Sequence, residues 1–233
     1  MSLPVAILAG GLATRLKPIT EKIPKSLVDV AGQPFIARQL GYLREQGIDR
    51  VVLCVGFLGE QIQTLVGDGS RFGLSVSYSQ DWPQLLGTGG ALRKAVPLLD
   101  SKFFVLYGDS FLPIDFAAVE KAFRNSGQPA LMTVQRNGNR WDKSNVLFQN
   151  SSIVEYNKRE PRPDMEHIDY GLGAVSAAIL HQPMDIAFDL ADVYHELSLS
   201  KQLAGYEVHE RFFEIGSHQG LAEAADYFRG RGR

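Results

Sequence analysis

Three short, continuous apolar segments in the first half of the chain constrain its fold more than any other feature. They cover residues Val5–Ala9, Val51–Val55 and Phe103–Tyr107, and the first and the last of them end directly at a glycine. Runs of this length without polar alternation are typical of parallel strands that are buried on both faces. Because helical patterns separate them, the sequence predicts an α/β fold, a Rossmann-like three-layer sandwich with a mostly parallel central sheet.

Helix and strand signals along the rest of the chain divide it into two unlike halves. Pro34, Thr88 and Asp115 are expected at helix starts, and Gly47 ends a helical pattern. Helices are expected over residues 34–47, 60–66, 88–96, 115–123 and 191–199, and after residue 217. Strands are expected over residues 74–78, 130–134, 145–148, 153–156, 168–178 and 212–215. We predict one domain, residues 1–233, with a strand–helix half to about residue 128 and a smaller mixed-strand half from about residue 129.

Composition excludes several classes of protein. Cys54 is the only cysteine, so the chain forms no internal disulfide and no cysteine-thiolate zinc site, and its five histidines lack paired metal-ligand spacing. The formal net charge of -2 gives no overall basic field for nucleic acid, so phosphorylated ligands would need local cations and backbone amides. No apolar stretch reaches the length of a membrane span, and the N-terminus lacks a cationic signal-peptide start. We therefore expect a cytoplasmic protein that binds neither nucleic acid nor membranes.

The segment from Leu8 to Lys25 carries the densest functional signal. Gly10 and Gly11 directly follow the first expected strand, at the edge where open α/β sheets bind ligands, and glycines let backbone amides approach a phosphate closely. Arg15 supplies a planar fork for phosphate oxygens, and Lys25 supplies a mobile positive charge. The string lacks the third glycine of a dinucleotide fingerprint and the Gly-Lys-Ser/Thr of a Walker A loop. The alternative is a tight turn with two solvated cations, which fits two glycines better than it fits the whole string.

Three further positions lie at expected helix or strand ends. The glycine-rich run from Gln84 to Leu92 predicts a helix start that offers backbone amides to a flat or anionic ligand, or else a flexible turn before a core helix. Asp109 directly follows a buried strand, and Glu214 lies in the last expected strand, so each is either a Mg²⁺ ligand or an ordinary strand-end acid. No second aspartate stands two residues after Asp109, which argues against a glycosyltransferase on a related fold.

One string of residues resembles the signature of the sugar-1-phosphate nucleotidyltransferases. It reads Leu8-Ala-Gly-Gly-Leu-Ala-Thr-Arg-Leu-Lys-Pro-Ile-Thr and is followed by Pro24-Lys25. The resemblance covers residues 3 to about 225 and is strongest in the first 110, and Ala13 departs from the family's usual glycine. It implies that Arg15 binds the leaving pyrophosphate, that Lys25 contacts the reacting phosphates, and that Gln84 faces the base edge. The implied catalytic residues are Arg15, Lys25 and Asp109. The implied nucleotide-binding residues are Leu8, Ala9, Gly10, Gly11, Thr14, Gln84, Gly87, Thr88 and Gly89.

The resemblance also implies a magnesium site and a sugar-phosphate site. Mg²⁺ would be held by Asp109 and Glu214, although the family usually has aspartate where this chain has Glu214. Lys158 matches the family's phosphate-binding lysine, whereas Asn157 replaces an acid that binds sugar hydroxyls. Residues 169–171 fall where the family has Asn-x-Gly at the sugar site. The candidate sugar-phosphate-binding residues are Asn157, Lys158, Asp169 and Gly171.

The implied reaction joins a nucleoside triphosphate to a sugar 1-phosphate and releases pyrophosphate and a nucleotide-sugar. The chain most resembles short bacterial guanylyltransferases, so the leading substrates are GTP with D-glycero-D-manno-heptose 1-phosphate or mannose 1-phosphate, used in lipopolysaccharide or other cell-surface polysaccharide biosynthesis. Short uridylyltransferases of cell-wall recycling are also similar, which leaves other base and sugar pairs open. Two other classes stay open: a phosphocholine-type cytidylyltransferase, with Trp141, Tyr156 and Tyr170 as an aromatic cage, and a non-catalytic nucleotide-sugar-binding module. The expected assembly is a monomer or a small homo-oligomer.

Overall fold

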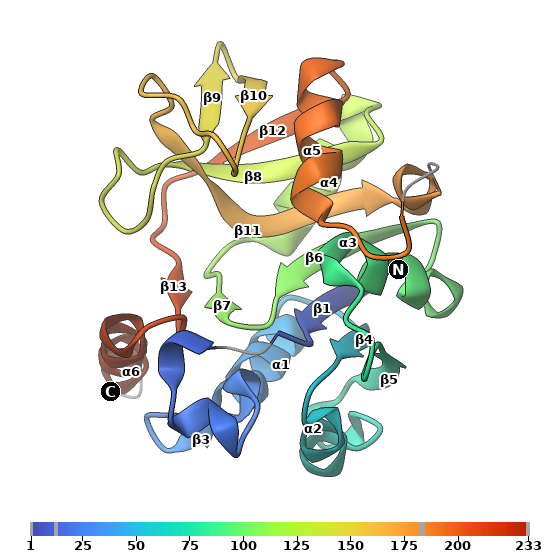
Figure 1. The fold of residues 1–233 in the computed structure, drawn as a ribbon, viewed down its shortest axis with the longest axis vertical. Coiled ribbons are helices and arrows are strands. Elements are labelled where there is room, and N and C mark those ends of the chain that lie inside the picture. The colour runs from blue at the N-terminus through green and yellow to red at the C-terminus, as the bar shows by residue number, and fades with distance from the viewer. Residues whose placement is uncertain (1, 12–13, 182–184, 232–233) are drawn as a thin grey trace.

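A mixed sheet of nine strands forms the centre of the computed structural model, which describes residues 2–11, 14–181 and 185–231 (Figure 1). One part of this sheet is parallel and has the strand order β6-β1-β4-β5. These strands are β1 Val5–Ala9, β4 Arg50–Val55, β5 Ser75–Gln80 and β6 Lys102–Tyr107. The structure therefore confirms the parallel sheet that the apolar runs predicted.

The second half of the chain extends the same sheet with strands of mixed direction. They are β8 Ala130–Arg136, β9 Val146–Gln149, β10 Ser152–Tyr156, β11 His167–Ser176 and β12 Leu203–Val208. β11 runs antiparallel to β6, with Leu172 opposite Leu106, and so joins the two halves of the chain. β12 lies parallel to β8 and was not expected from the sequence. Its centre, Ala204 and Gly205, lacks the β-branched and aromatic residues that identify strands.

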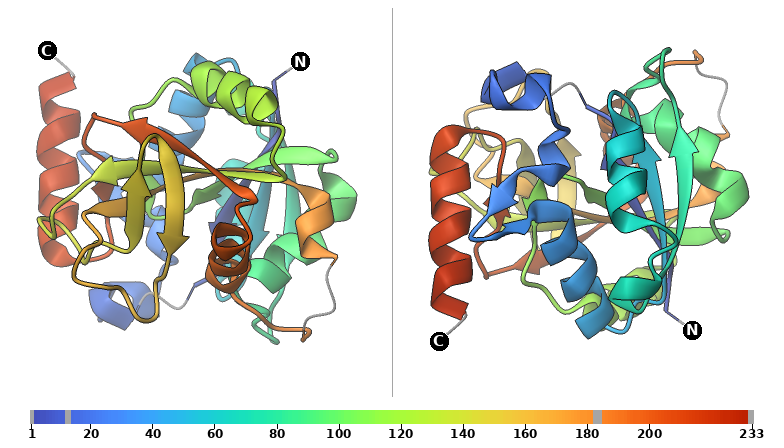
Figure 2. Two further views of the ribbon diagram at one scale, coloured as in Figure 1. Left: turned by 90° about the horizontal axis from the view of Figure 1, so that it is seen from above. Right: turned by 90° about the horizontal axis from the view of Figure 1, so that it is seen from below.

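Helices cover both faces of the sheet and complete three layers (Figure 2). They are α1 Phe35–Glu45, α2 Gly59–Val66, α3 Gly87–Ala95, α4 Phe116–Ser126, α5 Leu190–Leu199 and α6 His218–Arg231. One buried cluster packs α1, α2 and α4 onto the sheet through residues such as Ile36 and Phe116. A second cluster packs α3 and α5 onto the opposite face through residues such as Leu92 and Val193. The predicted Rossmann-like three-layer sandwich is confirmed, and over the described residues no helix combines the length and apolar character needed to cross a bilayer.

Two small antiparallel sheets and α6 complete the fold beside the end of β6. They pair β2 Asp29–Val30 with β3 Gln33–Pro34, and β7 Ser110–Phe111 with β13 Phe213–Glu214. Glu214 lies opposite Ser110, and the backbone N–H of Ile215 donates to the carbonyl oxygen of Asp109 at 2.9 Å. α6 packs on this pair of strands, where the rings of Phe111 and Phe228 lie 4.7 Å apart. The pairing therefore brings Glu214 next to Asp109, although about a hundred residues separate them in sequence.

The start of α3 corrects one expectation. Thr88 does not cap this helix, because α3 begins at Gly87 and Thr88 is its second residue. The hydroxyl of Thr88 instead accepts a hydrogen bond from the N–H of Leu190 at 2.8 Å and donates to Asp189 at 3.2 Å. Leu190 is the first residue of α5, so Thr88 satisfies an amide at the start of the neighbouring helix. By contrast, Asp115 caps α4 as predicted, since its carboxylate accepts from the N–H of Ala118 at 3.0 Å.

Candidate functional site

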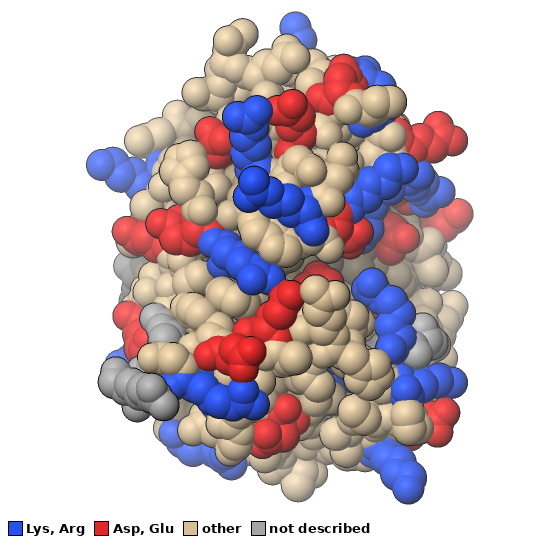
Figure 3. Space-filling view, turned by 90° about the vertical axis from the view of Figure 1, so that its left-hand side faces the viewer, with Lys and Arg blue, Asp and Glu red and all other residues tan. Residues whose placement is uncertain are grey.

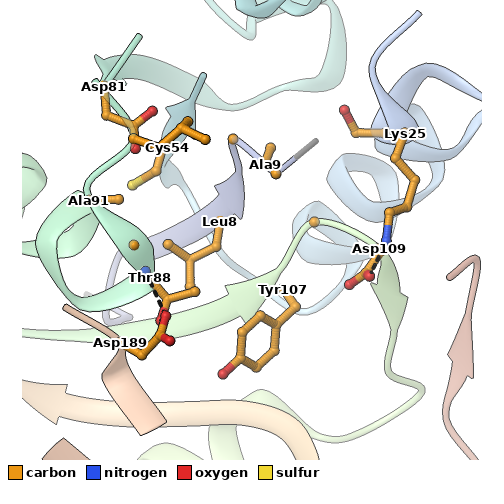
Figure 4. A pocket seen from close by; sticks show the side chains of 16 residues that line it. Leu8, Ala9, Lys25, Cys54, Asp81, Thr88, Ala91, Tyr107, Asp109 and Asp189 are labelled. Atoms are coloured by element: carbon orange, nitrogen blue, oxygen red, sulfur yellow. Dashed lines mark hydrogen bonds and ion pairs between the residues drawn. The ribbon is translucent and has the colours of Figure 1, made fainter. Parts of the chain in front are cut away.

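A cavity of about 300 Å³ lies over the carboxyl ends of β1 and β6, and we call it the β1 cavity (Figure 4). The end of β1 with Gly10 and Gly11 lines it, together with α3, the short helix Lys25–Leu27 and the end of β6. The structure gathers here most of the residues that the sequence assigned to the nucleotide and its phosphates. Those that line the cavity are Leu8, Ala9, Gly10, Gly11, Lys25, Gly87, Thr88 and Asp109.

The glycines at the start of α3 make room for the protein's own chain as well as for the cavity. Gly87 has a φ of +70°, and a Cβ there would lie 2.5 Å from the carbonyl oxygen of Phe188. The N–H groups of Gly89 and Gly90 donate to the same oxygen at 2.9 and 3.2 Å. The segment before α5 therefore occupies amides that the sequence had suggested for a ligand, while Gly87 and Thr88 still face the β1 cavity.

An ion pair joins two of the predicted catalytic residues at one end of the β1 cavity. Nζ of Lys25 lies 2.6 Å from Oδ2 of Asp109, and the two side chains are 19% and 26% exposed. Figure 4 shows this pair at one end of the cavity, with Asp81 and Cys54 at the other. A charge-assisted bond this short occupies one oxygen of the carboxylate, so a metal ion bound to Asp109 would compete with Lys25 for it.

A second cavity, of about 220 Å³, adjoins the first, and we call it the β11 cavity. Tyr107 and Asp109 line both cavities, so the two share a wall at the end of β6. Arg15 lines the β11 side and Lys25 the β1 side, which places a cation on each side of Asp109. The other lining residues come from five distant segments: Ser110, Asp142, Asn145, Tyr156, Lys158, Ile168, Asp169, Tyr170, Gly171, Phe212 and Glu214.

An irregular stretch of β11 presents Asp169 to the β11 cavity. The pairing of β11 with β8 shifts register between Asp169 and Gly173, and Gly171 takes a φ of +103°. Within this stretch the N–H of Gly171 donates to Oδ1 of Asp169 at 2.9 Å, and the N–H of Asp169 donates to Asn145 at 3.0 Å. Interruptions of this kind re-aim side chains and are common beside functional sites. Here the interruption brings Asp169 and Gly171 to the same cavity as Lys158.

Burial sets the protonation of the groups around Asp169. It raises the pKa of Asp169 from 3.8 to about 6, against the opposing effects of the Gly171 N–H and the charge of Lys158. Burial also raises the pKa of Tyr107 and of Tyr156 well above the usual value for a phenol, and the charge of Asp169 adds to both shifts. These hydroxyls therefore keep their protons, and Asp169 is the group here that titrates near neutrality.

Asp109 and Glu214 form the candidate magnesium site. Burial, with the nearby charge of Asp109, raises the pKa of Glu214, while Arg15 and Lys25 act in the opposite direction. Two like charges that influence each other in a partly buried site favour binding of a cation. Among the described residues no group of three or more histidine, cysteine or acidic side chains is placed to hold a metal ion. Mg²⁺ commonly takes only one or two carboxylates and completes its shell with substrate phosphates and water, so the pair fits an ion that arrives with phosphates.

Three of the predicted residues do not line either cavity, and a fourth cannot be placed there or elsewhere. Gln84 is exposed, and Gly89 is buried under the segment that precedes α5. The side chain of Asn157 belongs to a turn, because its oxygen accepts from the N–H of Glu160 at 2.9 Å. The side chain of Thr14 lies outside the part of the chain that the structure describes.

The structure also adds residues that the sequence analysis did not assign. Asp81 and Asp189 line the β1 cavity, Asp142 lines the β11 cavity, and Tyr107 lines both. Asp81 directly follows β5, as Asp109 directly follows β6. The same rule, an acid at the carboxyl end of a strand, would have identified Asp81 had β5 been expected to reach residue 80 instead of residue 78.

Charge at the site is local and does not belong to a broad surface field. On the face in Figure 3, lysine and arginine side chains are intermingled with aspartate and glutamate around a hollow near the middle of the view. The cations that the cavities contain are Lys25 in the first and Arg15 and Lys158 in the second. That these local cations would hold phosphates, as expected from the small net charge, stays a prediction.

Comparison with known proteins identifies the class to which this fold and site belong. The sequence model of the nucleotidyl transferase family matches residues 5–144, which is more than half of the chain. The chain therefore belongs to the nucleotidyl transferase family. The matched segment contains β1 and its glycines, Lys25, the start of α3 and Asp109.

Individual relatives are sugar-1-phosphate nucleotidyltransferases. The chain is similar to the N-acetylmuramate alpha-1-phosphate uridylyltransferase of Neisseria meningitidis serogroup B, with 41% identity over 113 residues, 48% of this chain and 49% of that protein. It is also similar to the D-glycero-alpha-D-manno-heptose 1-phosphate guanylyltransferase of Campylobacter jejuni, with 37% identity over 114 residues, 49% of this chain and 51% of that protein. The chain thus spans about half the length of the curated relatives it matches. The crystal structure of HddC from Yersinia pseudotuberculosis complexed with GMP-PN shares the fold, with a TM-score of 0.80 over 97% of this chain and 99% of that one, at 24% identity.

Proposed function

We propose that this protein transfers a nucleotidyl group from a nucleoside triphosphate to a sugar 1-phosphate, releasing pyrophosphate and a nucleotide-sugar. The observation that carries the proposal is the wall shared by the two cavities at Tyr107 and Asp109. The β1 cavity would hold the nucleotide over Gly10 and Gly11, and the β11 cavity would hold the sugar phosphate beside Lys158. The two ligands would then meet at Asp109, which is the arrangement that a transfer between them needs.

The chain's own residues would act by positioning the substrates and neutralising their charge. A sugar phosphate oxygen is already anionic, so it can form its bond to the α-phosphorus without a general base. The bond from that phosphorus to the bridging oxygen breaks, and pyrophosphate leaves with the electron pair. We assign Lys25 to the phosphates on the nucleotide side, Lys158 to the incoming sugar phosphate, and Arg15 to the leaving pyrophosphate. Preorganised charges of this kind account for much of the catalysis in phosphoryl-type transfers.

Asp109 and Glu214 are the residues that would hold Mg²⁺. When bound, the ion would neutralise phosphate charge and hold the two anionic substrates near each other. Oδ2 of Asp109 is bonded to Lys25 in this structure, so Lys25 would turn from the carboxylate to the phosphates as the substrate enters. The raised pKa of Glu214 means that this carboxylate ionises less readily than a free glutamate, which predicts weaker metal binding at acidic pH.

The base and the sugar are the finer part of the proposal. The relatives include uridylyl-, guanylyl- and thymidylyltransferases that act on several sugar 1-phosphates, so they favour the reaction type over any one pair. Our leading pair remains GTP with D-glycero-D-manno-heptose 1-phosphate or mannose 1-phosphate, in the synthesis of a cell-surface polysaccharide. The phosphocholine alternative loses support, because Trp141 does not line the β11 cavity and the guanidinium of Arg211 already lies 5.2 Å from its ring centre.

A pyrophosphate-release screen tests the proposal. Four nucleoside triphosphates would each be combined with a panel of sugar 1-phosphates, with phosphocholine and CTP as a separate arm. We expect pyrophosphate only when a triphosphate, a sugar 1-phosphate and Mg²⁺ are all present, and none after addition of EDTA. Release without any acceptor would indicate a hydrolase. Tight binding of nucleotide-sugars without release in any arm would indicate a binding module.

A further inference from the structure

Lys158, the lysine of the β11 cavity, lies just beyond the end of a strand at the edge of the sheet. β10 ends at Tyr156 and forms one end of the nine-stranded sheet, beside β9. Lys158 itself is exposed, so packing around its own side chain does not fix its position. The bonds that hold the backbone on either side of Lys158 therefore decide where its ammonium group can reach.

The backbone of Tyr156 is bonded on both its N–H and its carbonyl side to α5. The N–H donates to Oγ of Ser198 at 3.0 Å, and the carbonyl oxygen lies 2.6 Å from Nδ1 of His195. Because a carbonyl oxygen can only accept, Nδ1 of His195 carries the proton in this contact. Oγ of Ser198, a buried residue, donates in turn to the carbonyl oxygen of His195 at 2.6 Å. The three residues thus form a closed ring of hydrogen bonds, which holds the end of β10 against α5.

A second contact joins α5 to the residue after Lys158. The guanidinium of Arg159 lies 2.6 Å from the carboxylate of Asp192 on α5. Both side chains reach solvent, so this ion pair adds little stability on its own. Its place in the chain is what matters, because Lys158 lies between Tyr156 and Arg159, which are both bonded to the same helix. Figure 1 shows α5 beside β10.

The first turn of α5 is fixed at the wall of the β1 cavity. The N–H of Leu190 donates to Thr88 at 2.8 Å, and Thr88 also bonds to Asp189, as Figure 4 shows. His195 lies about 8 Å further along the helix axis than Leu190. Because the backbone hydrogen bonds of a helix run along its axis, they hold this spacing constant. α5 therefore connects the wall of the β1 cavity to the backbone that carries Lys158.

We propose that His195 is a positioning residue for Lys158, an inference that rests on the proposed binding of a sugar 1-phosphate beside Lys158. By donating to the carbonyl oxygen of Tyr156, His195 holds the end of β10 at a set distance from the nucleotide side. A transfer between two bound substrates needs such spacing, because the reacting atoms must be held in contact. His195 lines neither cavity, so it acts on the sugar phosphate only through this backbone.

Two substitutions separate the hydrogen bond of His195 from the bulk of its ring. His195→Phe keeps a ring and removes the donor, whereas His195→Asn keeps a donor near the position of Nδ1. We expect the KM for the sugar 1-phosphate to rise about tenfold in His195→Phe, the worth of one lost hydrogen bond, and to stay within about threefold of wild type in His195→Asn. The dissociation constant for nucleotide alone should change less than about threefold in both. The matched control is Ser200→Ala, whose lost hydroxyl donates within α5 to the carbonyl oxygen of Glu196 at 2.9 Å, and it should leave this KM unchanged.

A double substitution shows whether His195 acts through Lys158. Once Lys158→Gln has removed the ammonium group, adding His195→Phe should raise the KM further by less than about threefold. A merely structural role would instead give two effects that multiply in full. If thermal melting shows that His195→Phe does not fold, Ser198→Ala replaces it with the same expectations, because it removes the other bond to Tyr156.

The possible results separate this proposal from the proposed function. An unchanged KM in His195→Phe, an equal rise in Ser200→Ala, no rescue by His195→Asn, or effects that multiply in full with Lys158→Gln would each overturn the positioning role. Each of these results leaves wild-type turnover intact, so the proposed function would stand. A wild-type protein that releases no pyrophosphate with any acceptor would overturn both.

Discussion

The two cavities of this protein meet at Asp109 but are built in different ways. The β1 cavity takes part of its lining from two compact glycine-containing motifs, residues 8–11 after β1 and residues 87–88 at the start of α3, and adds side chains such as Lys25 and Asp109. The β11 cavity is formed by side chains from segments between Arg15 and Glu214, which only the folded chain brings together. A phosphate can be held by backbone amides of many sequences with the right glycines, whereas a sugar must be recognised by individual side chains. The comparison explains why the family signature is dense around the β1 cavity and sparse around the β11 cavity.

The largest effects should come from the residues that serve the meeting point of the two cavities. We expect Asp109→Ala and Arg15→Ala each to lower turnover by roughly 10²–10³ or more, because each removes a charge from the reacting centre. The steady-state rate of pyrophosphate release measures the turnover of each variant. Asp115→Asn is a matched control near the same strand end, since it caps α4 and lines neither cavity. Near-normal turnover in either alanine variant would break the claim that the cavities act together.

Asp169 should make the β11 cavity sensitive to pH in a way that the β1 cavity is not. The pKa of Asp169 is raised from 3.8 to about 6, so the folded state favours the protonated carboxyl. This group therefore contributes to the free energy of unfolding below the pKa of the unfolded state, and the contribution is lost as the pH rises through the pKa of the folded state. The loss should reach roughly 3 kcal/mol. Asp169→Asn cannot ionise, so it should become more stable relative to the wild type between about pH 4 and pH 7.5. Urea denaturation at both pH values measures the difference in the free energy of unfolding between the variant and the wild type. A difference that is the same at both pH values would contradict the burial of this carboxylate.

Lys25 and Lys158 should separate the two cavities kinetically. We expect Lys25→Gln to weaken nucleotide binding and Lys158→Gln to raise the KM for the sugar phosphate, each by roughly 10- to 100-fold, which is the usual worth of a hydrogen bond to a charged group. Titration with nucleotide alone and kinetics at varied sugar phosphate distinguish the two effects. Equal effects of both variants on both substrates would show that the cavities do not hold separate ligands.

The smallest effect should come from a residue that the sequence placed at the sugar site and the structure places in a turn. Asn157→Ala removes the acceptor for the N–H of Glu160, so it should cost about 1 kcal/mol of stability. The KM for the sugar phosphate should stay close to the wild-type value, because Asn157 does not line the β11 cavity. A rise in this KM as large as that expected for Lys158→Gln would show that Asn157 contributes to sugar-phosphate binding.

These expectations show which features the sequence could predict. The apolar runs of β1, β4 and β6 gave the parallel sheet, and a glycine or an acid after a strand end located Gly10 and Asp109. Such signals are local, because a parallel strand and its edge are encoded within a few residues. β12 was missed, since its central Ala204 and Gly205 carry no strand signal.

The rest of the candidate site depends on contacts between distant segments. Thr88 could be assigned as a cap from its neighbours, but its true partners, Asp189 and Leu190, lie about a hundred residues away. The irregular pairing of β11 that brings Asp169 to the β11 cavity depends on the strands on either side of β11. No residue spacing in the sequence predicts it. Asp81 was found only when the folded structure placed it in the wall of the β1 cavity, because β5 was expected to end before it.

The central claim is that the β1 and β11 cavities are two halves of one active site joined at Asp109. A crystal structure of the protein with Mg²⁺ and GDP-mannose, a product of the proposed reaction, tests it most directly. The account predicts the nucleoside over Gly10 and Gly11, the diphosphate beside Asp109, and the sugar between Lys158 and Asp169. Density for the sugar outside the β11 cavity, or for the diphosphate away from Asp109, would contradict it.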